Sequence, residues 1–216
     1  MVTASEPSSS TSTATLNRLS VYLRCLKELE RAGATTTSSQ ALADRFHLSS
    51  AQIRKDLAQF GEFGIRGVGY QIGPLAERLH HLLGLDKKRR LVIVGMGQLG
   101  TALAGYIHFN DASFEVVAGV DNDPEKIGRK RRGVPVYAID QLARVIEETG
   151  AEIAVLTVPA AAAVECYDAV AAAGVRAVLN FAPVSLPERD NLRLKNVDLR
   201  TYLEEASFLL QSVSLS

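Results

Sequence analysis

The stretch "RLVIVGMGQLGTALAGYIHF", residues 90–109, decides the fold of the second half of the chain. Residues 91–94 are consecutive apolar residues that predict a short buried strand, and a helix is expected from Thr101 onward. The turn between them comprises Gly95, Met96, Gly97, Gln98, Leu99 and Gly100. Its glycines permit a tight turn in which a pyrophosphate can lie against backbone amides at the positive end of a helix. The stretch therefore predicts a Rossmann-type dinucleotide site.

A second strand, within "FEVVAGVDND" at residues 114–123, ends at Asp121, about twenty residues beyond the loop. A carboxylate there accepts hydrogen bonds from the adenosine ribose hydroxyls and repels a 2′-phosphate. Lys126 and the basic residues 129–132 raise the alternative of NADP. Because they follow the turn at Pro124, we interpret them as a solvated loop and expect NAD or NADH as the cofactor.

Two later turns follow further predicted strands, in "IAVLTVPA" and "VRAVLNFAPV". Ligands of open parallel sheets bind at the carboxyl ends of the strands, so we expect these turns to complete the site. Thr157 and Asn180 offer polar groups to a nicotinamide amide, and Phe181 with the prolines offers an apolar wall. The residues concerned are Thr157, Val158, Pro159, Asn180, Phe181, Ala182 and Pro183. The alternative is that both are ordinary turns between a strand and a helix.

The first part of the chain predicts short helices instead. The stretch at 16–33 places leucines on one helical face, and Gly33 ends it. Two capped helices follow, the first opened by a capping box Thr37-x-x-Gln40 and the second by Ser49-x-x-Gln52. A turn of about four residues separates them, which is the helix-turn-helix pattern.

The second of these helices has the properties of a DNA-reading helix. Ile53, Leu57 and Phe60 share its inward face, whereas two small alanines and Lys55 point outward. Gln52 can pair with adenine, and Arg54 and Lys55 carry charge for phosphates or guanine edges. The alternative is a solvated amphipathic helix. The expected DNA contacts are Ser50, Gln52, Arg54, Lys55, Arg66 and Tyr70.

The glycine-rich stretch "GIRGVGYQIG", residues 64–73, differs from the cofactor loop. No apolar strand precedes Gly67, and the next helix is expected only from Pro74, at its first position. A two-stranded hairpin fits better, with Ile65, Val68, Tyr70 and Ile72 as strand residues. A hairpin after a recognition helix is a wing, and Arg66 near its tip would meet a DNA groove or phosphate.

Charge and composition agree with a DNA-binding half and a second half of another kind. Residues 16–90 carry 13 Lys/Arg against 7 Asp/Glu, a balance of +6, and residues 91–216 carry 11 against 16, a balance of −5. A basic module that meets a polyanion explains this split, although chance variation between two solvated surfaces also does. Cys25 and Cys166 lack metal-ligand spacing and fit a reducing cytoplasm, and no metal site is expected. No secretory signal or membrane span is recognised.

These patterns predict an α/β protein with a winged helix-turn-helix domain, a Rossmann domain with a doubly wound parallel sheet, and a C-terminal helix. The expected boundaries are a disordered tail at 1–15, then 16–86, 87–198 and 199–216. After "NFAP" about thirty residues remain, too few for a substrate domain of usual size, and no histidine follows His108. We therefore expect no catalytic site.

The combination of "SSAQIRKDLAQFGEFGIRGVGY", "LVIVGMGQLGTAL", "DNDPEKIG", "LTVPA" and "LNFAPV" resembles the Rex family of redox-sensing transcriptional repressors. The resemblance covers the chain from about Leu16 onward and implies a homodimer that binds operator DNA and is released when NADH replaces NAD. It also implies that the last helix, with Phe208 on its apolar face, crosses to the partner subunit. The alternative is that this helix docks on its own sheet.

We further hypothesise a switch in which Arg24 on the first helix and Asp198 at the start of the last form a charge pair in one state only. The resemblance to the family implies that Tyr106 joins them. Two other functions stay open from the residues alone. One is a small NAD-dependent dehydrogenase with an accessory DNA-binding-like domain, and the other is a sugar- or nucleotide-responsive regulator with a vestigial Rossmann fold.

Overall fold

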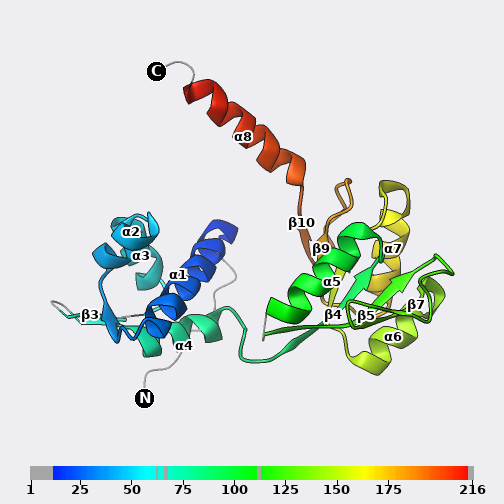
Figure 1. The fold of residues 1–216 in the computed structure, drawn as a ribbon, viewed down its shortest axis with the longest axis horizontal. Helices are drawn as coiled ribbons and strands as arrows, with labels where there is room; N and C mark the ends of the chain where they lie inside the picture. The colour runs from blue at the N-terminus through cyan, green and yellow to red at the C-terminus, as the bar shows by residue number, and fades with distance from the viewer. Residues whose placement is uncertain (1–11, 62, 66–67, 111–112, 214–216) are drawn as a thin grey trace. The chain divides into compact units, whose positions relative to one another are not determined.

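The computed structural model describes residues 12–61, 63–65, 68–110 and 113–213. The chain divides into two compact units, Met1–Lys87 and Lys88–Ser216 (Figure 1). Across the described ranges, no helix is long and apolar enough to cross a membrane.

The first unit is a winged helix built on four helices and a small sheet. The helices are α1 Thr13–Arg31, α2 Ser39–Phe46, α3 Ser50–Ala58 and α4 Ile72–Leu82. The strands are β1 Thr36–Thr37, β2 Gly64–Ile65 and β3 Gly69–Gln71, in the antiparallel order β1-β3-β2. One apolar core joins α1 to the other helices, and it buries Ile53, Leu57 and Phe60 of the α3 region as the helical period predicts.

Several local boundaries in this unit differ from the sequence prediction. The cap of α2 is Ser38, whose Oγ accepts from Ala41 N, because Thr37 lies in β1 and pairs with Tyr70. The helix α4 begins at Ile72, which is fully buried, so this residue is not in the hairpin and Pro74 is the third helical residue. The helix α1 begins at Thr13, inside the stretch expected to be disordered, because Ser12 caps it.

The second unit is a Rossmann domain. Its strands are β4 Arg89–Val94, β5 Phe114–Asp121, β6 Lys130–Arg131, β7 Val134–Ala138, β8 Ile153–Leu156, β9 Ala177–Asn180 and β10 Arg193–Asn196. Their order is β10-β9-β8-β4-β5-β7-β6, with every pair parallel except β6–β7. Leaving out β6, this is the doubly wound order of dinucleotide-binding domains, in which the switch point lies between β4 and β8. The predicted doubly wound sheet is confirmed.

Helices cover both faces of this sheet. The covering helices are α5 Gln98–Asn110, α6 Leu142–Thr149 and α7 Ala160–Ala172, with a short 3₁₀ turn at Ile139–Gln141 before α6. A last helix, α8 Leu199–Val213, follows β10 and does not pack on the sheet. Val92 and Val94 of β4 pack in one core with α6 and α7, whereas Leu91 and Ile93 pack in another with α5. The continuous apolar run of β4 is therefore explained by burial on both faces.

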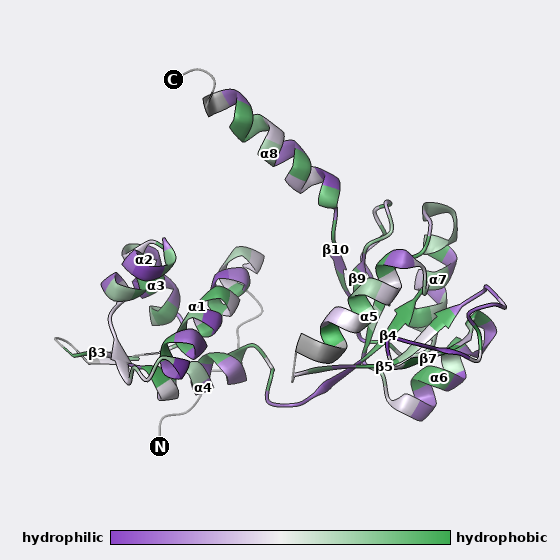
Figure 2. Cartoon of the chain, viewed as in Figure 1, coloured by the Kyte–Doolittle hydropathy of each residue, from purple (hydrophilic) through white to green (hydrophobic). Residues whose placement is uncertain are grey.

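One helix boundary in this unit was not anticipated. The helix α5 begins at Gln98, three residues before the expected Thr101, because the Thr101 amide already donates to Gly97 O at 3.0 Å. The helix α8 carries hydrophobic and hydrophilic residues along its length (Figure 2), and residues 199–211 are exposed, with Leu203 at 71%.

Candidate cofactor site and nucleic-acid interface

A cavity of about 870 Å³ opens at the carboxyl ends of β4, β5, β8 and β9. It lies at the switch point of the sheet, where ligands of this fold class bind. The cavity is lined by the glycine-rich loop, by the turns that follow β5, β7, β8 and β9, and by part of α7. The loop and turn residues are Gly95, Gly97, Leu99, Asp121, Asn122, Lys126, Ile139, Asp140, Thr157, Val158, Pro159, Phe181 and Pro183, together with Val94 and Val120 at the strand ends. Two turns distant in the sequence therefore converge on the predicted loop.

The three glycines of the loop have different reasons to be glycine. Gly95 has φ +95°, and a Cβ there would lie 2.9 Å from Thr157 O. A Cβ on Gly100 would lie 2.0 Å from Gly95 O. A Cβ on Gly97 would meet no protein atom within 4 Å, and Gly97 borders the cavity. Packing therefore requires the first and third glycines, whereas the space at Gly97 is left for a ligand, as a pyrophosphate against the α5 amides would need.

Asp121 ends β5 and joins that strand to the loop. Its Oδ2 accepts from Met96 N at 2.7 Å and from Lys126 Nζ at 3.1 Å, and its Oδ1 accepts from Asp123 N at 2.9 Å. Burial raises the pKa of Asp121, but the bonds from Asp123, Lys126 and Met96 outweigh it and hold the pKa below its usual range. The carboxylate is therefore ionised at neutral pH and still borders the cavity.

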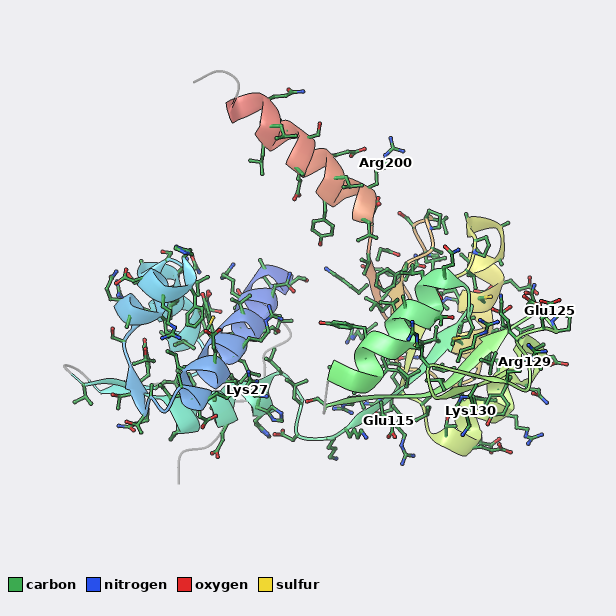
Figure 3. The ribbon with its side chains drawn as sticks, viewed as in Figure 1. Lys27, Glu115, Glu125, Arg129, Lys130 and Arg200 are labelled. Atoms are coloured by element: carbon green, nitrogen blue, oxygen red, sulfur yellow. The ribbon has the colours of Figure 1, made fainter. Side chains whose placement is uncertain are left out.

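Lys126 has a different environment from the basic residues 129–132, with which the sequence analysis groups it. Its ammonium pairs with Asp121 and with Asp123 at 3.3 Å, and hydrogen bonding to Asp121 raises the pKa of Lys126. Arg129 and Lys130 are exposed at the surface of the unit (Figure 3). Our interpretation of the cluster as a solvated loop was wrong for Lys126, which lines the cavity with its charge neutralised by two carboxylates.

The polar side-chain atoms of Thr157 and Asn180 form hydrogen bonds within the domain. Thr157 Oγ1 donates to Gly95 O at 2.6 Å and lies 3.1 Å from Val94 O, which fixes the glycine-rich loop. Asn180 is 1% exposed: its Oδ1 accepts from Ala182 N, and its Nδ2 donates to Val184 O and Asn196 Oδ1. The expectation that Asn180 offers its amide to a nicotinamide is not met in this conformation, because the amide holds the turn after β9.

The remaining predicted site residues divide between the cavity wall and the core. Val158, Pro159, Phe181 and Pro183 form an apolar part of the cavity wall. Met96 and Ala182 are buried, and neither they nor Gln98 and Gly100 line the cavity. Asn122, Asp140, Glu165 and Cys166 line it without having been predicted. Asn122 lies in the quoted stretch "DNDPEKIG" but its neighbour Asp121 was singled out instead, and no motif marks the other three.

The recognition helix α3 presents the outward face that the sequence predicts. Ala51, Lys55 and Ala58 are exposed, and Ser50 is half-buried at the first position of the helix. Arg54 is exposed but held by the domain, since its Nη1 donates to Ser39 Oγ of α2 at 2.9 Å. The helix therefore carries one basic side chain fixed against α2 and one, Lys55, on the open face.

A further predicted DNA contact, Tyr70, lies in the strand β3 of the wing. This residue is half-buried, its ring lies close to Gly64, and burial raises the pKa of its hydroxyl while the charge of Arg54 opposes that rise. Arg66, the other predicted wing contact, lies outside the described residues.

The predicted switch residues are exposed in their own units. Arg24 is exposed on α1, Tyr106 is 68% exposed on α5, and Phe208 is 70% exposed on α8. Asp198 Oδ1 accepts from Arg200 N at 2.9 Å and so caps α8. Among the residues described by the structure, no cluster of His, Cys, Asp or Glu could hold a metal ion.

Known proteins similar to this chain cover nearly its whole length. The redox-sensing transcriptional repressor Rex of Desulforamulus reducens is 45% identical over 197 residues, which is 91% of this chain and 94% of that protein. The protein of the same name from Thermus thermophilus is also 45% identical over 197 residues, covering 91% and 92%. The chain belongs to the Rex family of redox-sensing transcriptional repressors. The resemblance to the Rex family is thereby confirmed.

Solved structures of a Rex-family repressor, RSP, share the fold. RSP in complex with β-NAD⁺ and operator DNA matches with a TM-score of 0.88 at 34% identity, covering 95% of this chain and 94% of that one. RSP in complex with β-NADH matches with a TM-score of 0.85 at 32% identity, covering 96% and 97%. Two family models also match, "CoA binding domain" at residues 86–184 and "Putative DNA-binding protein N-terminus" at residues 10–58.

Proposed function

We propose that this chain is a transcriptional repressor that reads the balance of NADH and NAD. It holds operator DNA in its apo or NAD-bound state and leaves the operator when NADH binds. The observation that carries the proposal is the cavity beside Gly97 and Asp121 in a chain whose other unit presents a helix-turn-helix. The names of its Rex relatives and the two liganded RSP structures support the same proposed function.

The cofactor site would use the loop and turns at the switch point. Backbone amides around Gly97 and the start of α5 would hold the pyrophosphate, and Asp121 would accept from the adenosine ribose. The ionised Asp121 favours NAD(H) over a 2′-phosphorylated cofactor, and Lys126 does not reverse that preference because its charge is already paired.

The signal is the charge of the nicotinamide ring, which is positive when oxidised and absent when reduced. Phe181 and Pro183 provide an apolar wall that accepts an uncharged ring at lower desolvation cost than a cation. A ligand shifts a conformational equilibrium only by its difference in affinity for the two states. The two redox forms would therefore stabilise different arrangements of the chain, one of which binds DNA.

The DNA site would combine α3 and the wing. Ser50, Gln52 and Lys55 lie on or beside the open face of α3. Arg54 of the same helix and Tyr70 of β3 would add to this contact surface, and Arg66, which lies outside the described residues, would be a further contact. The partner is double-stranded DNA with an inverted repeat, because a two-fold homodimer matches such a repeat.

Dimerisation would use α8. Its exposed apolar residues, among them Leu199, Leu203 and Phe208, require a partner surface, and a second copy of the chain supplies one. In one of the two states Arg24 of one unit would pair with Asp198, with Tyr106 nearby. In this assignment residues 16–86 bind DNA, 87–198 bind the cofactor and 199–216 form the dimer, and the protein works in the cytoplasm.

Two experiments separate this function from its rivals. In a thermal shift assay NADH should raise the unfolding temperature of the chain, whereas a regulator with a vestigial Rossmann fold would show no protection. NADH should not be consumed with small carbonyl substrates, whereas a dehydrogenase would turn it over.

A further inference from the structure

Gln52 does not complete the capping box that its position predicts. Ser49 Oγ accepts from Gln52 N at 3.3 Å, which is the forward half of the box. The Gln52 side chain bonds in the other direction along the helix: its Nε2 donates to Asp56 Oδ1 at 2.7 Å, one turn later. The side chain of a predicted base-reading residue is thus tied to its own helix.

Asp56 is a fully buried carboxylate that accepts four hydrogen bonds. Arg18 of α1 donates from Nε to Oδ2 at 2.6 Å and from Nη2 to Oδ1 at 2.8 Å. Tyr22 of α1 donates its hydroxyl to Oδ2 at 2.9 Å, and Gln52 gives the fourth bond. An ionised carboxylate offers about four acceptor sites, so this set is complete.

This arrangement fixes which way the Gln52 amide points. A carboxylate accepts and cannot donate, so only the NH₂ group of Gln52 can face Asp56. Turning the amide over would place its carbonyl oxygen against a buried anion. The carbonyl oxygen and the second N–H of Gln52 therefore remain for an outside partner, with a defined order of acceptor and donor.

That order matches one base edge in the major groove. Adenine presents an N6 donor beside an N7 acceptor, which pair with the carbonyl and the N–H of an amide. Guanine presents two acceptors there, so its O6 would face the fixed Gln52 carbonyl. Gln52 also lies in the first turn of α3, the part of a recognition helix that contacts base edges.

We propose that Arg18, Tyr22 and Asp56 are positioning residues that set the base preference of this protein by fixing the Gln52 amide to read adenine. The inference rests on the proposed function, since it requires that α3 enters operator DNA. Arg18 and Tyr22 lie on α1, so the helix that carries Arg24 also determines how the recognition helix presents its amide.

A matched pair on α2 provides the control. Gln40 Nε2 donates to Asp44 Oδ1 at 2.7 Å with the same spacing along the helix, but both residues are exposed. Loss of the Gln40 amide therefore removes the same kind of bond from a surface that is not expected to read bases.

The test is selection of binding sites by the full chain from duplex DNA randomised over the half-site, followed by affinity measurements on single-base variants. We expect the wild type to favour adenine at one half-site position by about tenfold, and Gln52→Ala to lose that preference. Asp56→Asn, checked for folding by circular dichroism, should weaken the preference at the same position without changing the salt dependence of binding.

If Asp56→Asn does not fold, Tyr22→Phe replaces it, because it removes one hydrogen bond and no charge. Gln40→Ala should leave every position unchanged.

Two results would overturn the inference. One is a Gln52→Ala protein with unaltered base preferences, and the other is an Asp56→Asn or Tyr22→Phe protein that binds all sequences more weakly by the same factor. A wild-type chain that enriches no sequence at all would instead contradict the proposed function.

Discussion

The Asp121 carboxylate at the end of β5 accepts a hydrogen bond from the Met96 amide of the glycine-rich loop over 2.7 Å. This bond connects the residue expected to meet the ribose with the loop expected to meet the pyrophosphate. The two parts of the proposed cofactor site are therefore held in one arrangement before any ligand enters, which lowers the ordering that binding requires.

Removal of the Asp121 charge should weaken cofactor binding. We expect Asp121→Asn to lower NADH affinity about tenfold, because hydrogen bonds to a charged group contribute roughly 1.5–3 kcal/mol. Titration calorimetry measures the change. Glu125→Gln removes an exposed carboxylate four residues later in the sequence (labelled in Figure 3) and should leave the affinity unaltered; an equal loss in both variants would point to a general charge effect.

The glycines of the loop should respond differently to the same added methyl group. Gly97→Ala should keep the unfolding temperature and lower NADH affinity at least about tenfold, because its Cβ enters only the cavity. Gly100→Ala should destabilise the second unit by about 1–3 kcal/mol, because its Cβ meets Gly95 O. Thermal unfolding with and without NADH distinguishes the two. Normal NADH binding by Gly97→Ala would argue against a pyrophosphate at this loop.

Lys55 should act through DNA phosphates. Lys55→Ala should weaken binding to all DNA sequences and reduce the slope of log affinity against log salt concentration by about one. Fluorescence anisotropy at several salt concentrations measures this slope. Lys27→Ala on α1 is the control and should leave this slope unchanged. An unchanged slope for Lys55→Ala would show that Lys55 does not contact DNA phosphates.

The Arg18–Asp56 pair should make the first unit sensitive to acid. Burial raises the pKa of Asp56, but hydrogen bonds from Arg18, Gln52 and Tyr22 outweigh it and hold the pKa below its ordinary value. A carboxyl whose pKa is lowered by folding adds stability above its unfolded pKa, about 4, and loses that stability as pH falls through the folded value.

Arg18→Met should therefore destabilise the first unit by about 3 kcal/mol at pH 7 and by less near pH 3, because it leaves a buried carboxylate without its cation. Hydrogen exchange of the α3 amides in the full chain, in increasing urea, reports this unit separately. A difference that is constant or larger in acid would contradict the assignment of an ionised Asp56.

Local sequence patterns were sufficient to predict those strands and helices whose apolar residues alone determine which face is buried. The apolar run before Gly95 predicts a short buried strand, and the spacing of Ile53, Leu57 and Phe60 predicts the buried face of α3. The short strands β1 and β10 were missed because a few residues become a strand only through their partners, β3 and β9.

Side-chain roles that depend on distant partners could not be predicted. Asp56 follows Arg54 and Lys55 in sequence and looks like part of a charged surface, but its partner Arg18 lies 38 residues earlier. Asn180 looks available at the end of a strand, but Asn196 and the next turn occupy its amide. In both cases the deciding contact comes from tertiary packing.

The most direct test of the account is the affinity of the full chain for an inverted-repeat duplex, selected by the protein itself, in the presence of saturating NAD and of saturating NADH. We expect tight binding with NAD and binding weaker by on the order of tenfold or more with NADH, the range of coupling between two sites on one protein. Equal affinity with both cofactors would contradict the proposal that this protein senses the redox state of NAD.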